Sequence, residues 1–212
     1  VRSEHRKYLP QLERETDDSY DRRLSRSNVV PFTQRIEKML AGMITRKPVR
    51  LDDVSDLVRE QLFDVDLEGN DLNVWLYETA RTAISFGHVG VLVDAPKGGD
   101  KTRPYWVTYS PRNILGWRSE IIDGARQLTQ LRLLENVVEP DGKYGEKQVK
   151  QIRVLERGRY EIHRKDKKNS EYKLFDEGEM SLKDKIPFAV AYSNRVGFYE
   201  SRSPLYDIAE LN

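Results

Sequence analysis

Residues 71–96 read DLNVWLYETARTAISFGHVGVLVDAP, and the spacing of the apolar side chains changes within this stretch. Before Gly87 the apolar and small side chains recur every three or four residues, as they do on one face of an α-helix. Asp71 is suited to cap the start of this helix, and Gly87 to take the left-handed conformation that ends it. After Gly87, Val89–Val93 is a short continuous apolar run, typical of a buried strand. The stretch therefore predicts a helix followed directly by a strand.

The chain before this stretch predicts further helices. Asp17–Ser27 places Tyr20 and Leu24 at helical spacing, and Pro31–Ile44 carries an amphipathic stripe. A shorter helical turn is expected between Asp52 and Phe63.

The chain after this stretch predicts strands joined by short turns. The expected strands are Tyr105–Tyr109, Ile114–Ile122, Leu128–Val138, a hairpin that turns at Gly158, a pair around Tyr172 and Leu174, and Ile186–Tyr192. Since no helices intervene, the connections favour an antiparallel meander. The expected fold class is α+β, with a helical N-terminal half followed by an antiparallel meander-type sheet.

The predicted helices and strands divide the chain into three expected parts: a mainly helical part at residues 1–87, a β-rich part at 88–202, and the start of a helix at 203–212. Ser203 is suited to cap that last helix, and Pro204 to occupy its first position. Because the helix begins well and stops after about two turns, we expect the chain to be the N-terminal portion of a longer polypeptide.

The composition excludes several classes of protein. The 212 residues include 36 Lys and Arg against 35 Asp and Glu, and they contain no Cys. Disulfide frameworks, thiolate zinc sites and Cys nucleophiles are therefore excluded, and the apolar runs are too short to cross a bilayer. At 38% hydrophobic and 33% charged residues, the chain has either a thin core or neighbours that bury the rest of its surface.

The segment Lys97–Thr102, KGGDKT, follows an apolar strand as a phosphate-binding loop would. Such a loop needs glycines where this chain has Ala95 and Asp100, and a helix should follow it. A solvated loop is the favoured interpretation. A phosphate-handling enzyme that uses Lys101 and Thr102 is kept as the less favoured alternative.

The candidate metal ligands are scattered. His5, His88 and His163 lack the spacing of a ligand pair. The acidic stretch at residues 64–70 resembles half of a calcium loop, but its ligand spacing is broken. We interpret it as a polar turn before the helix that Asp71 caps. The sequence thus predicts no enzyme and no catalytic, cofactor-binding or metal-binding residue.

Two basic clusters offer a nucleic-acid-binding alternative. They comprise Arg22, Arg23 and Arg26, and then Arg164, Lys165, Lys167 and Lys168. Neither cluster is interleaved with aromatic residues, and nearby aspartates balance both. We interpret them as solvated faces, with a nucleic-acid-binding module as the alternative.

Several phrases, in order, resemble the portal proteins of tailed bacteriophages. They begin with Tyr8-Leu9-Pro10, Asp18-Ser19-Tyr20 and Leu24-Ser25-Arg26, followed by the helix through Arg35-Ile36 and Leu40–Ile44. The glycine-flanked strand Gly87–Pro96, Arg103-Pro104-Tyr105, the Tyr109–Arg118 segment, Ile186-Pro187-Phe188 and Ser203–Asn212 complete them. The order of the phrases carries the resemblance, which covers most of the chain.

The resemblance implies a subunit of a homo-oligomeric ring, usually a dodecamer, at one vertex of a virion capsid. It implies that double-stranded DNA passes through the ring, and that the major capsid protein, the terminase and the neck proteins are partners. The ring would assemble in the host cytoplasm, without a membrane or a cofactor, and this chain would correspond mainly to the wing-like region. The near-zero charge balance suits a conduit, since a strongly basic ring would hold DNA in place.

Overall fold

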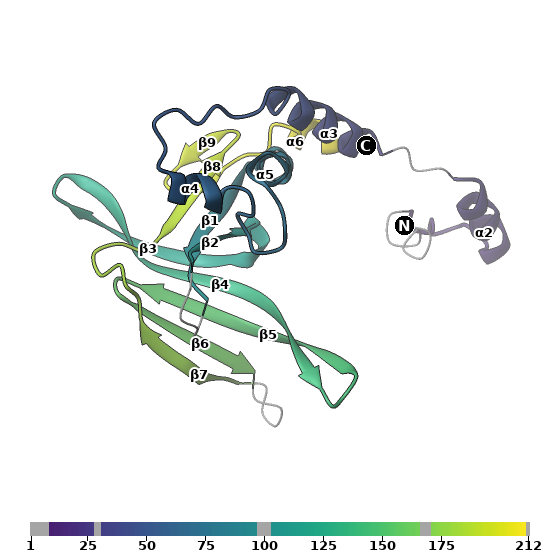
Figure 1. Ribbon diagram of the computed structural model, residues 1–212. Helices are drawn as coiled ribbons and strands as arrows, with labels where there is room; N and C mark the ends of the chain where they lie inside the picture. Colours follow the sequence, from purple (N-terminus) through teal and green to yellow (C-terminus); the bar gives the residue numbers. More distant parts are fainter. Residues whose placement is uncertain (1–8, 28–30, 97–102, 166–170, 211–212) are drawn as a thin grey trace.

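The computed structural model describes residues 9–27, 31–96, 103–165 and 171–210. These residues form five α-helices, a short 3-10 helix (η2, Pro111–Asn113) and ten strands (Figure 1). The helices are α2 (Asp17–Arg26), α3 (Phe32–Ile44), α4 (Asp56–Gln61), α5 (Leu72–Phe86) and α6 (Tyr206–Glu210). The strands are β1 (His88–Asp94), β2 (Tyr105–Tyr109), β3 (Ile114–Ile122), β4 (Ala125–Asp141), β5 (Gly145–Glu156), β6 (Arg159–Lys165), β7 (Tyr172–Glu179), β8 (Phe188–Tyr192), β9 (Arg195–Gly197) and β10 (Glu200–Ser201).

Helix α5 has the two ends predicted from the sequence. The Asp71 carboxylate accepts a hydrogen bond from the Val74 N–H at 2.9 Å, and Gly87 follows the helix at φ 90°. A Cβ at Gly87 would lie 2.5 Å from the Ser201 hydroxyl, so the chain needs glycine here for space as well as for conformation. The predicted helix, its caps and the strand after it are confirmed.

The first sheet has three antiparallel strands in the order β2-β1-β8. Strand β1 lies in the middle, pairing Leu92 with Val107 on one side and with Phe188 on the other. A Cβ at Gly90 would overlap the Phe188 ring, so only glycine fits at this position of β1. Strands β9 and β10 form a separate two-stranded ribbon.

The second sheet has five antiparallel strands in the order β3-β4-β5-β6-β7, each paired with the next along the chain. Strand β4 spans 17 residues, and its hairpin with β5 extends well beyond the first sheet (Figure 1). On β4 and β5 the alternation turns Leu131, Leu133 and Leu155 inward, and all three are buried.

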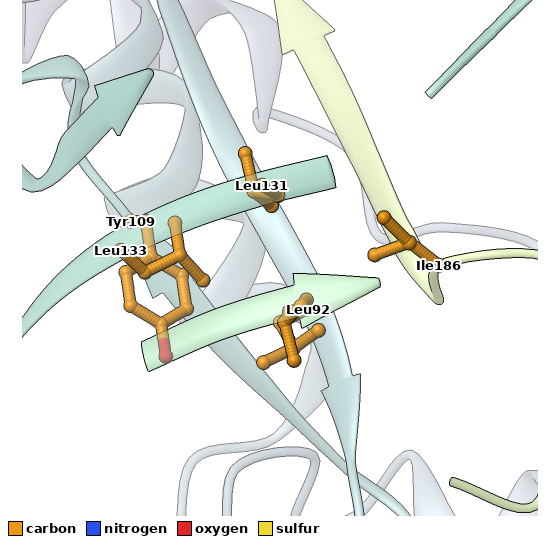
Figure 2. Close-up of a cluster of buried hydrophobic side chains, with 6 residues drawn as sticks. Leu92, Tyr109, Leu131, Leu133 and Ile186 are labelled. Atoms are coloured by element: carbon orange, nitrogen blue, oxygen red, sulfur yellow. The ribbon is translucent and has the colours of Figure 1, made fainter. Parts of the chain in front are cut away.

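The main core lies between the two larger sheets. Its buried side chains come from β1, β2, β4, β5 and the segment before β8: Leu92, Tyr109, Leu131, Leu133, Leu155 and Ile186 (Figure 2). A smaller cluster joins Ala41 of α3, Ile84 of α5 and Leu205 just before α6. The Ser203 hydroxyl donates to the Ile84 carbonyl at 2.9 Å and accepts from the Leu205 N–H at 3.1 Å, and α6 begins at Tyr206.

The expected fold class is wrong in its single meander-type sheet, although helices α2–α5 do precede the strands as predicted. The strands form three separate sheets, and β1 pairs with β8 from nearly 100 residues later as well as with its neighbour β2. A meander pairs only consecutive strands, so it describes the five-stranded sheet alone. Alternation of apolar residues locates a strand and its buried face, but it does not identify the partner of that strand.

Candidate functional site

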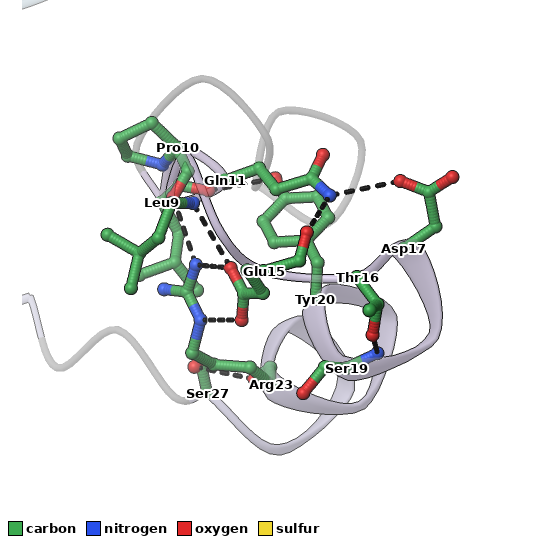
Figure 3. Close-up of polar contacts among 11 residues, drawn as sticks. Leu9, Pro10, Gln11, Glu15, Thr16, Asp17, Ser19, Tyr20, Arg23 and Ser27 are labelled. Carbon is green, nitrogen blue, oxygen red and sulfur yellow. Dashed lines mark hydrogen bonds and ion pairs between the residues drawn. The ribbon is translucent and has the colours of Figure 1, made fainter.

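Residues 9–27 form a small unit that lies apart from the sheets (Figure 1). Arg23 forms two hydrogen bonds with Glu15, of 2.8 and 2.6 Å, and a third with the Pro10 carbonyl (Figure 3). The Tyr20 hydroxyl donates to the Leu9 carbonyl at 2.8 Å. The bonds from Arg23 hold the pKa of the Glu15 carboxyl below its ordinary value.

The first basic cluster is therefore occupied by contacts within this unit. Besides the Arg23–Glu15 pair, Arg22 pairs with Asp18 one helical turn earlier. The interpretation of this cluster as a charge-balanced face is supported for Arg22 and Arg23. The sequence had pointed only to nearby aspartates as partners, whereas the partner of Arg23 is Glu15.

The second basic cluster is only partly described. Arg164 donates to Glu139 at 2.6 Å and to Gln151 at 3.1 Å, and its guanidinium lies 3.6 Å from the centre of the Phe175 ring. Lys167 and Lys168 lie outside the described residues. Arg164 is thus held by its own sheet.

The histidine and phosphate-loop candidates do not come together. His5 and residues 97–102, with Lys101 and Thr102, lie outside the described residues. The buried His88 has its Nδ1 atom 2.5 Å from the Ser201 hydroxyl, and His163 has its Nε2 atom 2.9 Å from Glu161. The described residues contain no group of three or more His, Cys, Asp or Glu side chains arranged to hold a metal ion.

The acidic stretch at residues 64–70 forms the polar turn that the sequence predicts. Asp66 accepts hydrogen bonds from the Glu68 and Asn70 N–H groups and from the Asn70 side chain. Asp64 accepts from the Gly69 N–H and pairs with Arg103 at 2.7 Å. The carboxylates of Asp64 and Asp66 are thus engaged in contacts within or next to the turn.

A polar network that was not predicted from the sequence joins the two larger sheets. Arg153 of β5 lies 2.5 Å from Asp94 of β1 and 3.0 Å from Glu135 of β4. Glu135 also accepts from the Tyr109 hydroxyl at 2.6 Å and from the Gln151 amide at 2.7 Å. One guanidinium thus faces carboxylates from both sheets.

The burial of this network fixes its ionisation. Burial alone would lower the pKa of Arg153, but the charges of Glu135 and Asp94 outweigh it and raise the pKa. Burial and the Glu135 charge both raise the pKa of Tyr109. Neither group exchanges a proton near neutral pH, so Arg153 and Tyr109 connect the sheets rather than supply an acid or a base.

The signal for this network was present in the alternation of the strands. Leu131, Leu133 and Glu135 share one face of β4, and Gln151, Arg153 and Leu155 share one face of β5. Charged side chains on the inward face of adjacent strands indicate a buried ion pair, since an unpaired buried charge is costly.

Large apolar side chains remain on the surface of the described residues. They include Phe32, Met39, Met43 and Ile44 on α3, Leu57 and Val58 on α4, Ile121 on β3, and Leu174 and Phe175 on β7. Within the described ranges, no helix is both long and apolar enough to span a bilayer.

Comparison with known proteins gives no family assignment. The chain matches no protein-family model and no curated protein.

Proposed function

We propose that this chain is a subunit of the portal of a tailed bacteriophage. In this proposal copies of the chain form a ring at one capsid vertex, and double-stranded DNA passes through the ring during packaging and ejection. The terminase and the neck proteins would dock on the ring in turn, and its work would be structural rather than catalytic. The ordered phrases that resemble the portal family motivate the proposal.

The observation that supports it most is the number of large apolar side chains left exposed on the described residues. The surface carries exposed apolar side chains on several separate elements, including α3, α4 and β7. Exposed apolar side chains that gather on one surface mark interaction sites, and a ring subunit needs one such surface for each of its neighbours.

The polar contacts favour neither alternative function. Arg22 and Arg23, which a nucleic-acid-binding module would use, are paired with Asp18 and Glu15. Arg153 and Tyr109, the strongly perturbed groups of the sheet junction, stay in one ionisation state near neutral pH.

Mass photometry of the intact gene product tests the proposal. We expect particles of ring size that negative-stain electron microscopy shows with a central opening. A protein that stays monomeric at every concentration would contradict the proposal.

A further inference from the structure

A cavity of about 450 Å³ lies between α5, strand β2 and the turn at residues 64–70. Three carboxylates line it, Asp66, Glu68 and Glu78, together with the indoles of Trp75 and Trp106. Among the described residues, no Lys or Arg lines this acidic–aromatic cavity.

The carboxylates leave the cavity with net negative charge. Burial alone would raise the pKa of Asp66, but the hydrogen bonds from Asn70 and from the Glu68 N–H outweigh that effect. The pKa of Asp66 therefore lies below its ordinary value, and the carboxyl group stays ionised at neutral pH. Glu78 pairs with Arg81 at 2.8 Å, but the same guanidinium also pairs with Glu37 at 2.7 Å. No partner for the Glu68 side chain occurs among the described residues.

The rest of the lining suits an organic cation. The rings of Trp75 and Trp106 meet edge to face, with centroids 4.8 Å apart, and an indole face attracts ammonium and guanidinium groups. Thr79 also lines the cavity and is only 6% exposed, and its hydroxyl has no hydrogen-bond partner within the described part of the chain. That oxygen has less than 1 Å² of accessible surface, so a bound cation would contact the indoles and the carboxylates instead.

The neighbouring strand offers backbone groups for an extended ligand. Strand β2 is an edge of its sheet, and the Trp106 N–H points away from β1, donating to the Val65 carbonyl at 2.8 Å. Because hydrogen-bonding directions alternate along an antiparallel strand, the N–H and C=O of Thr108 point to the same outer side. On that side, no described backbone group pairs with Thr108.

From these observations we propose that the acidic–aromatic cavity binds a Lys or Arg side chain of an extended peptide that pairs with the edge of β2 at Thr108. The backbone of the peptide would supply the pairing with the strand. Its cationic group would lie against the Trp rings and the three carboxylates.

Isothermal titration calorimetry of the full chain tests this proposal. The ligand is the peptide Thr-Val-Arg-Val-Thr, acetylated at its N-terminus and amidated at its C-terminus. We expect saturable binding that weakens as salt rises. The Glu68→Gln variant should raise the dissociation constant by about tenfold, because it removes a charged partner without disturbing a described contact. Glu60→Gln, which removes a charge from the exposed face of α4, is the matched control and should bind as the wild type does.

Two further measurements separate the parts of the proposal. A peptide with Glu in place of Arg, or with N-methylated backbone groups, should bind much more weakly. Equal binding by Glu68→Gln and wild type would overturn the cation site. Equal binding by free arginine amide, or by the N-methylated peptide, would overturn the strand pairing.

Discussion

Gly90 is the residue at which the first sheet is most closely packed, because the Phe188 ring of β8 lies where a Cβ would project. Gly90→Ala should therefore lower the free energy of unfolding by about 1–3 kcal/mol, the usual cost of overpacking. Gly42→Ala is the control, since a Cβ on that α3 residue would meet no atom within 4 Å. It should raise the stability by about 0.5–1 kcal/mol, because glycine weakens a helix. Urea denaturation checks both, and a stable Gly90→Ala protein would contradict this packing.

His88 is the residue that gives the fold a dependence on pH near neutrality. Burial lowers its pKa below the ordinary value of 6.5, so between the folded and unfolded pKa values the unfolded chain binds a proton that the folded chain does not. The stability is therefore fully present above pH 6.5 and falls as the pH drops through that value. We expect the free energy of unfolding to decrease between pH 7.5 and pH 5.5. In His88→Gln the decrease should be smaller, and an identical pH profile for the two proteins would refute this assignment.

Among the elements, β5 is joined to β1 across the sheet junction by the ion pair between Arg153 and Asp94. Arg153→Met should lower the free energy of unfolding by about 3 kcal/mol, because it leaves Asp94 and Glu135 facing each other without a cation. Thermal and urea denaturation measure the loss.

Two further variants show whether charge is the cause. Adding Asp94→Asn and Glu135→Gln to Arg153→Met should restore most of the stability, since no uncompensated charge then remains. Arg159→Met removes an exposed arginine that pairs with Glu161, and it should change the stability by less than about 0.5 kcal/mol. Equal losses for Arg153→Met and Arg159→Met would rule out the buried network as a source of stability.

The elements also show how far the sequence could predict this molecule. Helix α5 and β1 were predictable because Asp71, Gly87 and the apolar spacing all act within one segment. The pairing of β1 with β8 was not, since it depends on contacts between segments nearly 100 residues apart. For the same reason the Asp94–Arg153–Glu135 network and the acidic–aromatic cavity, which each combine separate elements, could not be located from local patterns.

At the scale of the whole molecule, the exposed apolar side chains of α3 bear on assembly. Met39→Glu/Met43→Glu places two charges on exposed positions of this helix. We expect the circular dichroism spectrum and the melting temperature to be unchanged and the fraction of ring-sized particles to fall strongly, because a charge is costly in an apolar contact.

Lys38→Glu is the matched control for this double variant. It changes the net charge by the same amount on an exposed residue of the same helix, but it removes no apolar surface. Rings should persist in this control. If the double variant assembles as well as Lys38→Glu does, the face of α3 takes no part in the contact between subunits.

The central position of β1 has a consequence for the order in which the nascent polypeptide acquires its shape on the ribosome. The five-stranded sheet can form hairpin by hairpin as translation proceeds, because each of its strands pairs with the next. Strand β1 leaves the exit tunnel long before β8, and one of its edges stays open until residues 188–192 have emerged. At roughly 5–20 residues per second, that edge waits about 5 to 20 seconds for its second partner. The three-stranded sheet is therefore completed only after all strands of the five-stranded sheet have been synthesised.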